Sequence, residues 1–410
     1  MTRAVTTLCI VFLVLAATMA TAGTFFPIGV WYEGGVGAYR NDLIPEDPRL
    51  AAIEYRRDFS DLAAHGINAA VVPNTQPNHH KPLLDAAADK GVKLIVELDK
   101  NGGELGEIVR GGLPLTNETT KNTFDTKLKP IEKHPALLGV QLLDEPGGGS
   151  YDRYRTVAAS LKTYAPKLVP FCCLAGVGNV EEFLTRAKPE VVAFDCYPVG
   201  VGNPIGDPRP MLGFQGAALQ ASLAGLKHQV PVWAVLQVHS ITGIHRFPTP
   251  AEIRCMTYLS LAVGCKGIYW FLYQTEYWNK DRNEFMGGLV DQNFKGDERW
   301  VEVGKLAREI RKLVPTLQQL QLAPDAVVTA ANAQAHVLTD SAGRVYVFAV
   351  NTDTLKSRRV TVRLDQPAGS RSMEVVKQPS GSIIQAGRIA DKLIWTDTLA
   401  PGDGALYMVR

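Results

Sequence analysis

Eight short, almost continuously apolar runs recur between residues 26 and 315, and a longer segment with helical spacing of apolar residues follows each of them. The runs are 26–32, 67–73, 92–98, 137–143, 168–173, 191–195, 230–237 and 267–273. Strands have this composition when helices cover both faces of a parallel sheet. Several helical segments end in glycine or shortly before proline, as helices do. Eight strand–helix units in roughly 290 residues predict an α/β fold, namely a (β/α)8 TIM barrel.

The competing α/β architecture is an open, doubly wound sheet. Such a sheet typically carries a glycine-rich phosphate loop after its first strand, and none follows the first run here. The fragment "GVGNV" at 176–180 has only the character of a turn. The barrel is therefore the favoured architecture.

The pattern changes after about residue 322 to strands with alternating apolar and polar residues, joined by turns of Asp, Gly and Ser. Examples are "VYVFAVNT", "RRVTVRLD", "KLIWTDTL" and "GALYMVR". This pattern predicts a separate all-β sandwich. We therefore expect a barrel over residues 23–320 and a β-sandwich domain over 321–410.

The N-terminus has the layout of a secretory signal peptide. Arg3 precedes an apolar stretch, and the small-residue site Ala20-Thr21-Ala22 follows it. The stretch is shorter than the ~20 residues that a membrane-spanning helix needs. We expect residues 1–22 to be a signal peptide, the mature chain to begin at Gly23, and the protein to be secreted or periplasmic.

Composition narrows the range of partners. The chain has 410 residues, 20% of them charged, and a formal net charge of +2. Without a long basic run, this argues against nucleic acid or a membrane surface as the main partner. Five cysteines follow the signal segment in apolar patterns that are typical of small buried side chains, and their spacings do not indicate a zinc site. His79 and His80 are adjacent, and we expect them to be solvated in a loop rather than to bind a metal.

The ends of the predicted strands carry carboxylates and aromatic residues, and barrel enzymes place their chemistry at these ends. An aromatic face stacks on a sugar ring, and carboxylates bind its hydroxyls. Glycoside hydrolysis needs two carboxyl groups, one to protonate the leaving oxygen and one to attack or to activate water. The residues predicted to contact substrate are Trp31, Glu33, Asn74, Glu97, Tyr197, Gln237, Trp270, Tyr273 and Glu276.

Three acids are the predicted catalytic residues. Glu145 is the general acid, and the glycines 147–149 leave it unobstructed. Asp144 is placed to orient a hydroxyl or to keep Glu145 protonated by like-charge repulsion. Asp195 shares its alternation with Val191 and Ala193, so it points inward and ranks ahead of Glu276 as the second carboxylate. Its short side chain favours a wide gap and an inverting reaction.

These motifs resemble those of secreted barrels of glycoside hydrolase clan A. The motif Asp144-Glu145-Pro146 resembles their Asn-Glu-Pro-like motif after strand 4, which implies that Glu145 is the acid/base. Segments 231–273 and 194–200 are similar to strands 6 to 8 of bacterial β-galactosidase-like barrels. The family's nucleophile, a glutamate that ends strand 7, is replaced by Gln237, so that role does not carry over.

The sequence thus favours a secreted glycoside hydrolase that acts on a poly- or oligosaccharide without a metal or organic cofactor. One alternative is a non-catalytic carbohydrate-binding protein on a degenerate barrel. A third hypothesis, a polysaccharide lyase, requires a dense set of Arg and Lys at the strand ends, and these ends carry acids instead.

Overall fold

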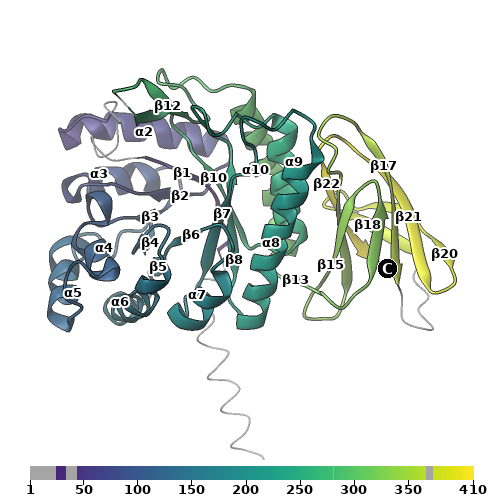
Figure 1. Ribbon diagram of the computed structural model, residues 1–410, viewed down its shortest axis with the longest axis horizontal. Helices are drawn as coiled ribbons and strands as arrows, with labels where there is room; N and C mark the ends of the chain where they lie inside the picture. Colours follow the sequence, from purple (N-terminus) through teal and green to yellow (C-terminus); the bar gives the residue numbers. More distant parts are fainter. Residues whose placement is uncertain (1–24, 34–43, 280, 366–372) are drawn as a thin grey trace, which may run out of the picture.

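A computed structural model describes residues 25–33, 44–279, 281–365 and 373–410 of the chain. The predicted signal peptide and its cleavage site lie outside these residues. Within them, a barrel of parallel strands and helices is followed by two antiparallel sheets (Figure 1). The predicted fold class, a TIM barrel with a C-terminal β-sandwich, is confirmed.

All eight predicted apolar runs form barrel strands. They are β1 (Ile28–Trp31), β2 (Ala69–Val72), β3 (Lys93–Val96), β4 (Leu137–Gln141), β5 (Val169–Phe171) with β6 (Cys173–Ala175), β7 (Val192–Cys196), β8 (Val232–Gln237) and β10 (Gly267–Phe271). The fifth run is divided at Cys172, because β5 pairs with β4 whereas β6 pairs with β7. The remaining neighbours are parallel, and β1 pairs with both β2 and β10.

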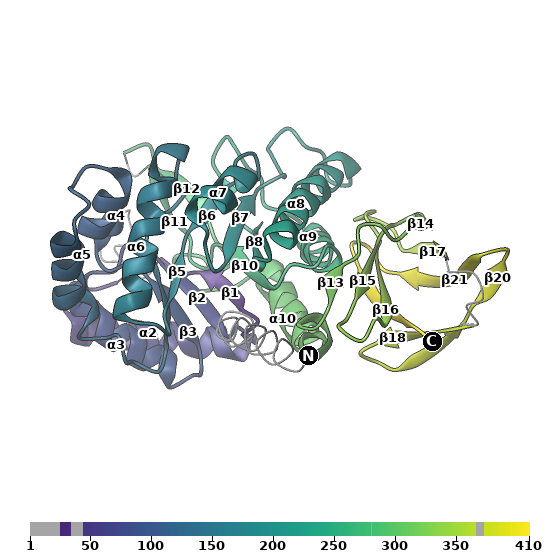
Figure 2. The ribbon, with the colours of Figure 1, turned by 90° about the horizontal axis from the view of Figure 1, so that it is seen from below.

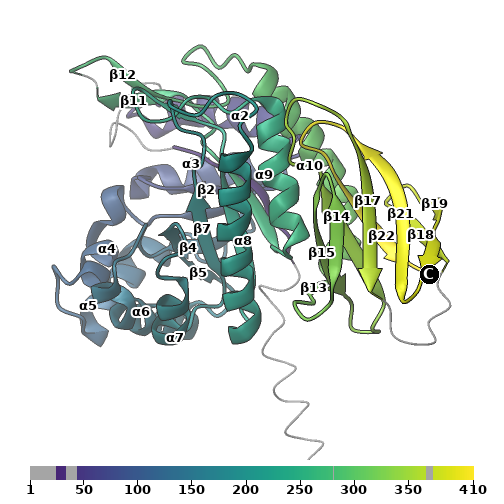
Figure 3. The same ribbon diagram turned by 45° about the vertical axis from the view of Figure 1, so that its right-hand side comes forward.

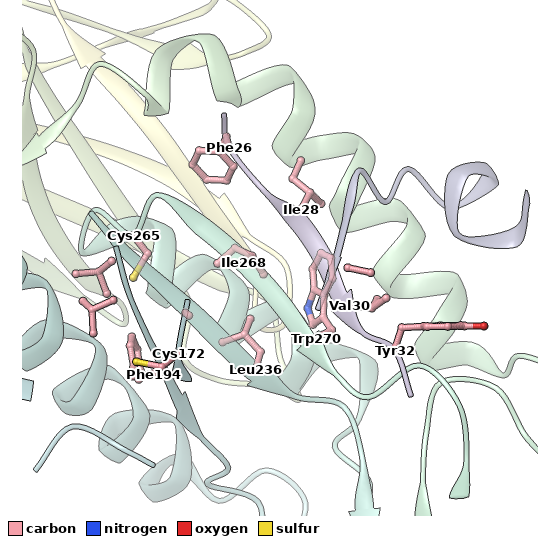
Figure 4. Packing of buried hydrophobic residues seen from close by; sticks show 14 of the residues in the cluster. Phe26, Ile28, Val30, Tyr32, Cys172, Phe194, Leu236, Cys265, Ile268 and Trp270 are labelled. Atoms are coloured by element: carbon pink, nitrogen blue, oxygen red, sulfur yellow. The ribbon is translucent and has the colours of Figure 1, made fainter. Parts of the chain in front are cut away.

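The two faces of each strand carry different layers of side chains. Alternate residues point into the barrel, as Val71, Trp233 and Tyr269 do, or outward against the helices. Figure 4 shows part of the outer layer, including Leu236 and Trp270. Both layers are apolar, which explains why the strands appear in the sequence as continuous apolar runs.

Helices surround the strands (Figure 2). They are α2 (Pro48–Ala64), α3 (Pro77–Ala88), α4 (Gly103–Arg110), α5 (Asn117–Thr123), α6 (Tyr151–Tyr164), α7 (Val180–Ala187), α8 (Pro208–His228), α9 (Pro250–Ala262) and α10 (Glu298–Leu317). Local signals fix their starts: Thr249 and Glu252 form a capping box at α9, and Asp47 caps α2 before Pro48. None of the helices in the described ranges is both long and apolar enough to cross a membrane.

A small antiparallel sheet, which the sequence pattern did not predict, adjoins the carboxyl ends of β8 and β10. It consists of β9 (Ser240–Ile241), β11 (Glu276–Asn279) and β12 (Glu284–Gly287), with β12 in the middle. Figure 3 shows β11 and β12 above the barrel. This sheet brings Ile241, Glu276 and Met286 to the barrel mouth.

The C-terminal sandwich packs directly against the barrel. One sheet contains β13 (Gln321–Leu322), β15 (Gln334–Thr339), β16 (Val345–Val350), β22 (Gly404–Val409), β18 (Glu374–Gln378) and β19 (Ser382–Gln385), and the other contains β14 (Val328–Ala331), β17 (Arg358–Asp365), β21 (Lys392–Leu399) and β20 (Gly387–Ile389). The six-stranded sheet lies against α8 and α9 (Figure 1). Its other face forms the core between the two sheets, around Trp395 and Tyr407.

Candidate active site

A pocket of about 700 Å³ opens at the carboxyl ends of the barrel strands, a volume in the range of small-molecule sites. It is lined by Trp31, Glu33, Pro73, Asn74, Glu97, Asn101, Arg110, Leu143, Asp144, Glu145, Cys173, Asp195, Tyr197, His239, Ile241, Phe271, Glu276 and Met286. Nine of the twelve residues predicted for the site are among them, all except Gln237, Trp270 and Tyr273.

Glu145 occupies a left-handed backbone conformation just beyond β4. Its φ is 45°, which for a residue with a side chain costs on the order of 1–2 kcal/mol. Its backbone N–H donates to the carbonyl of Cys173 at 2.9 Å, so β6 holds the turn in place. A Cβ added at Gly147 or Gly149 would meet no atom within 4 Å, so the glycine run leaves open space beside the acid.

Asp195 lies near the end of β7, with only 8% of its surface exposed. Burial raises the pKa of Asp195 to about 7, and the negative charge of Glu145 and a hydrogen bond between the two carboxyl groups act in the same direction. The N–H of Gly176 opposes this shift by donating to Oδ1 at 3.0 Å. A carboxyl group with this pKa can hold a proton at neutral pH.

The separation of the Glu145 and Asp195 carboxyl groups decides which stereochemical outcome the pair could support. Inverting carboxyl groups lie ~6.5–9.5 Å apart and retaining ones ~5–5.5 Å apart. Both side chains line the same pocket, and the charge of Glu145 is close enough to raise the pKa of Asp195. The wide gap and the inverting reaction stay predictions. The fifth run, divided into β5 and β6, lies between β4 and β7, and its inward residue nearest the mouth is the small Cys173.

Asp144 faces the same pocket with an exposed side chain. Enclosure by the pocket walls raises the pKa of Asp144 well above its usual range, and the charges of Glu145, Glu97, Asp195 and Glu33 raise it further. Asp144 is thus exposed to solvent and partly desolvated at once, because the pocket that it faces is concave and its walls surround the carboxylate.

Asn74 connects the acids of the first and third strands. Its Nδ2 donates to Oε2 of Glu33 at 3.3 Å, and its N–H donates to Oε2 of Glu97 at 2.8 Å. The N–H of Gly102 donates to the same Glu97 oxygen at 3.2 Å. Burial raises the pKa of Glu97, although these two N–H groups act against it. Asn74 adopts a φ of 59°, a conformation that asparagine tolerates well.

Aromatic side chains form one wall of the pocket. Tyr197 is stacked on Phe271, with ring centroids 5.5 Å apart and an interplanar angle of 28°. Trp31 meets Phe271 edge-on at 5.8 Å, and His239 meets Tyr197 edge-on at 4.5 Å. Phe271 was missed in the sequence, although it shares its alternation with the inward-facing Tyr269. Arg110 comes from α4, where no strand-end signal points to it.

Trp270 and Tyr273 do not line the pocket, contrary to prediction. Trp270 belongs to the outer layer (Figure 4), and its Nε1 donates to Oγ1 of Thr257 at 3.3 Å. The hydroxyl of Tyr273 donates to Oδ2 of Asp61, on α2, at 2.7 Å. Trp270 packs against helices because its neighbours Tyr269 and Phe271 take the inward positions, and Tyr273 lies beyond the end of β10.

Gln237 ends β8 but turns toward the loop that follows β7. Its Oε1 accepts from the N–H of Val199 at 2.8 Å, and its Nε2 donates to the carbonyl of Val199 at 3.0 Å. The side chain has no exposed surface. An amide fits this position because it both donates and accepts, so Gln237 secures a loop and does not line the pocket.

His79 and His80 are buried in α3, which corrects the prediction of a solvated pair. Nδ1 of His79 is 2.9 Å from the hydroxyl of Tyr55, and Nε2 of His80 is 2.9 Å from the carbonyl of Glu97. Across the described ranges, no group of three or more His, Cys, Asp or Glu side chains is arranged to hold a metal ion. The five described cysteines are unpaired, and all but Cys196 are buried.

This architecture, a barrel followed by a C-terminal sandwich, is similar to that of solved glycoside hydrolase structures. No protein-family model and no curated protein sequence matches the chain.

Solved structures match over nearly the whole chain. A family 39 glycoside hydrolase from Bacteroides cellulosilyticus WH2 is 13% identical with a TM-score of 0.53, covering 94% of this chain and 81% of its own. A family 5 glycoside hydrolase from Bacteroides vulgatus is 12% identical with a TM-score of 0.60, covering 94% and 89%. The GH42 β-galactosidase Gan42B of G. stearothermophilus is 10% identical with a TM-score of 0.60, covering 94% and 98%. At these identities the likeness establishes the fold alone.

Proposed function

We propose that this protein is a secreted glycoside hydrolase that cleaves O-glycosidic bonds of a poly- or oligosaccharide. The observation that supports this most is the pocket itself. Strand ends around the barrel mouth and the adjoining small sheet direct six carboxylates into one cavity beside an aromatic wall. Two-carboxylate hydrolysis needs acids in such a setting. Export rests on the predicted signal peptide.

Glu145 and Asp195 together act as the acid. Both carboxyl groups line the pocket, and the pKa of Asp195 is raised to about 7, foremost by burial and also by the charge of Glu145, so Asp195 can hold a proton beside Glu145 at neutral pH. Glu145, on the open side, passes the proton to the glycosidic oxygen as the bond to the anomeric carbon breaks. Asp195 positions Glu145 and shares the remaining charge.

The second carboxylate comes from across the pocket. Glu276 lines the cavity from β11, beyond the last barrel strand, and is only 6% exposed. In ring order it lies on the opposite side from β4, so a sugar fits between Glu276 and Glu145. It attacks the anomeric carbon or activates the water that does so. The stacked Tyr197 and Phe271 offer apolar faces for a sugar ring.

The test is incubation of the purified mature protein with a panel of polysaccharides and oligosaccharides, with products separated by chromatography. Defined sugars should be released, and Glu145→Gln should lower turnover at least ~10²-fold, as loss of a general acid does. Glu118→Gln on the exposed start of α5 removes the same charge far from the pocket and should leave turnover unchanged. Release of sugars by Glu145→Gln at the parent rate would contradict the assignment.

One observation favours the second candidate, a carbohydrate-binding protein without catalysis. β8 ends in an amide that is engaged with a loop, at the position where the resembling enzymes carry a nucleophile. In the same panel, binding of a sugar without any product would support this alternative.

A further inference from the structure

The pocket holds more carboxyl groups than hydrolysis requires. Its carboxylates are Glu33, Glu97, Asp144, Glu145, Asp195 and Glu276. Among the described residues that line it, Arg110 is the one Lys or Arg side chain. Its guanidinium is already engaged, with Nη2 donating to the carbonyl of Asn101 at 2.8 Å and Nε to Glu107 at 3.2 Å. The proposed reaction uses Glu145, Asp195 and Glu276, and Glu33 and Glu97 accept hydrogen bonds around Asn74, so Asp144 is the acid that remains to be explained.

The neutral side chain of His239 adds one more hydrogen-bond acceptor to the carboxyl groups of the pocket. His239 lines the pocket and has no exposed surface. Its Nδ1 lies 3.0 Å from the carbonyl of Phe271, which accepts hydrogen bonds only, so Nδ1 carries the proton. Nε2 is then an acceptor, and it has no partner. A buried acceptor without a donor is costly, and a ligand with donors removes that cost.

A bound metal does not explain the carboxylates, because across the described ranges they form no group arranged to hold one. Asp144 shares the pocket with five other acids, and the charges of Glu145, Glu97, Asp195 and Glu33 act on it. Its carboxylate makes no hydrogen bond to another described residue. It is adjacent to Glu145, so a group bound to it belongs to the sugar at the cleaved bond.

We propose that the substrate is an amino sugar polymer, and that the protonated amine of the sugar at the cleaved bond binds to Asp144. An ammonium group supplies positive charge and three donors to a site that offers acceptors. The same field repels uronic and sulfated sugars. This inference rests on the proposed function only in calling the amino sugar a substrate. The affinity of the pocket for amino sugars can be tested by binding alone.

Monosaccharides that share a ring but differ in charge show how the charge of the sugar affects its binding. Glucosamine and galactosamine, their neutral parents glucose and galactose, and the corresponding uronic acids are titrated into the full-length mature protein and followed by NMR. The amines should bind about tenfold more tightly than the neutral sugars, the gain expected of a charge-assisted hydrogen bond, and the acids most weakly. The preference should shrink as salt rises.

Two variants test whether Asp144 causes the preference for amino sugars. Asp144→Asn keeps the shape and removes the charge, so the ratio of amine to neutral affinity should fall about tenfold. Asp89→Asn, on the exposed end of α3, is the matched control and should keep the ratio. Thermal unfolding of both variants checks that they are folded.

Hydrolysis of glucosamine oligomers and of glucose oligomers of equal length then separates this inference from the proposed function. Cleavage with preference for the amine supports both proposals. Cleavage of neutral sugars with no preference for amines in binding overturns the amino sugar alone. Selective binding of amines without cleavage of any oligomer supports the inference and overturns the hydrolase. Equal or tighter binding of uronic acids overturns the inference in every case.

Discussion

At the scale of single residues, the site depends on acids that are brought together although they repel one another. Burial comes first in raising the pKa of both Asp144 and Asp195, and neighbouring carboxylates add to it. Such an arrangement destabilises the folded protein and is found where chemistry requires a proton at neutral pH. The left-handed φ of Glu145 is a second local cost at the same place.

The first prediction concerns Asp195 and pH. The pKa of Asp195 is raised to about 7 in the folded protein, foremost by burial, and is ~3.9 in an unfolded chain. Between these values the folded state binds more protons, so stability falls as pH rises from about 4 to 7 and stays reduced above. Asp195→Asn removes this loss and keeps the acceptor for Gly176.

Urea unfolding at pH 4, 6 and 8 measures the effect. The variant should match the parent at pH 4 and exceed it at pH 8 by a few kcal/mol, since a tenfold change in proton affinity corresponds to ~1.4 kcal/mol. Its turnover should fall at least ~10²-fold. Equal stability of the two proteins at pH 8 would show that Asp195 is not a strained acid.

The second prediction concerns Gln237→Glu, which restores the glutamate of the resembling enzymes. The new carboxylate would lie against the carbonyls of Val199, His239 and Arg246, which now accept from Nε2. We expect a loss of about 2 kcal/mol in the free energy of unfolding and no gain in turnover. Gln237→Met, similar in length but apolar, is the comparison for the charge. A rise in turnover would mean that the side chain can reach the pocket.

At the scale of elements, apolar continuity identified all eight barrel strands, but it could not tell which side of a strand faces inward. Both sides are buried, so Trp270 and Phe271 look equally suited to the pocket in the sequence, and only the sheet places Phe271 inside. The small sheet β9–β12–β11 was missed because its strands are two to four residues long. Glu276 was predicted as a strand-end acid without its supporting strand.

The third prediction tests the contact between β4 and β5, which lies below the acids. A Cβ at Gly139 would come within 2.4 Å of the carbonyl of Val169 and 3.0 Å of its Cβ. Gly139→Ala therefore forces the two strands apart and should cost about 1–3 kcal/mol. Gly149→Ala, in the open turn beyond Glu145, is the matched control and should change stability by less than ~0.5 kcal/mol. Thermal unfolding compares them, and equal effects would contradict the packing described for β4.

At the scale of the whole molecule, the apolar core of the barrel continues onto one face of the six-stranded sheet, while the space between the two sandwich sheets is a separate core. Ten of the thirteen residues of α9 are buried, because barrel strands cover one side and the six-stranded sheet covers the other (Figure 3). Tyr258 meets Phe348 with ring centroids 6.0 Å apart, and Arg254 bonds Asp403 at 2.9 Å. The sequence predicted two domains from the change in the pattern of apolar and polar residues, but this change carries no information about the surface between the domains.

The last prediction concerns a chain that ends at Leu320, between α10 and β13. The barrel strands and their helices remain, so circular dichroism should still show an α/β fold. Without the sandwich, however, α9 loses the cover over Tyr258 and Cys255, whose burial stabilises the barrel by about 1.5–3 kcal/mol for each large side chain. We expect a lower unfolding temperature and binding of a hydrophobic dye that the full chain does not bind.

Trp395→Ala in the full chain is the control, because Trp395 packs between the two sandwich sheets and its loss leaves the contact between the sandwich and α9 in place. It should destabilise the sandwich without dye binding at low temperature. If the shortened chain unfolds at the temperature of the full chain, the interface contributes nothing to the barrel. If it fails to fold at all, the barrel is not an independent domain, and the boundary at residue 320 is wrong.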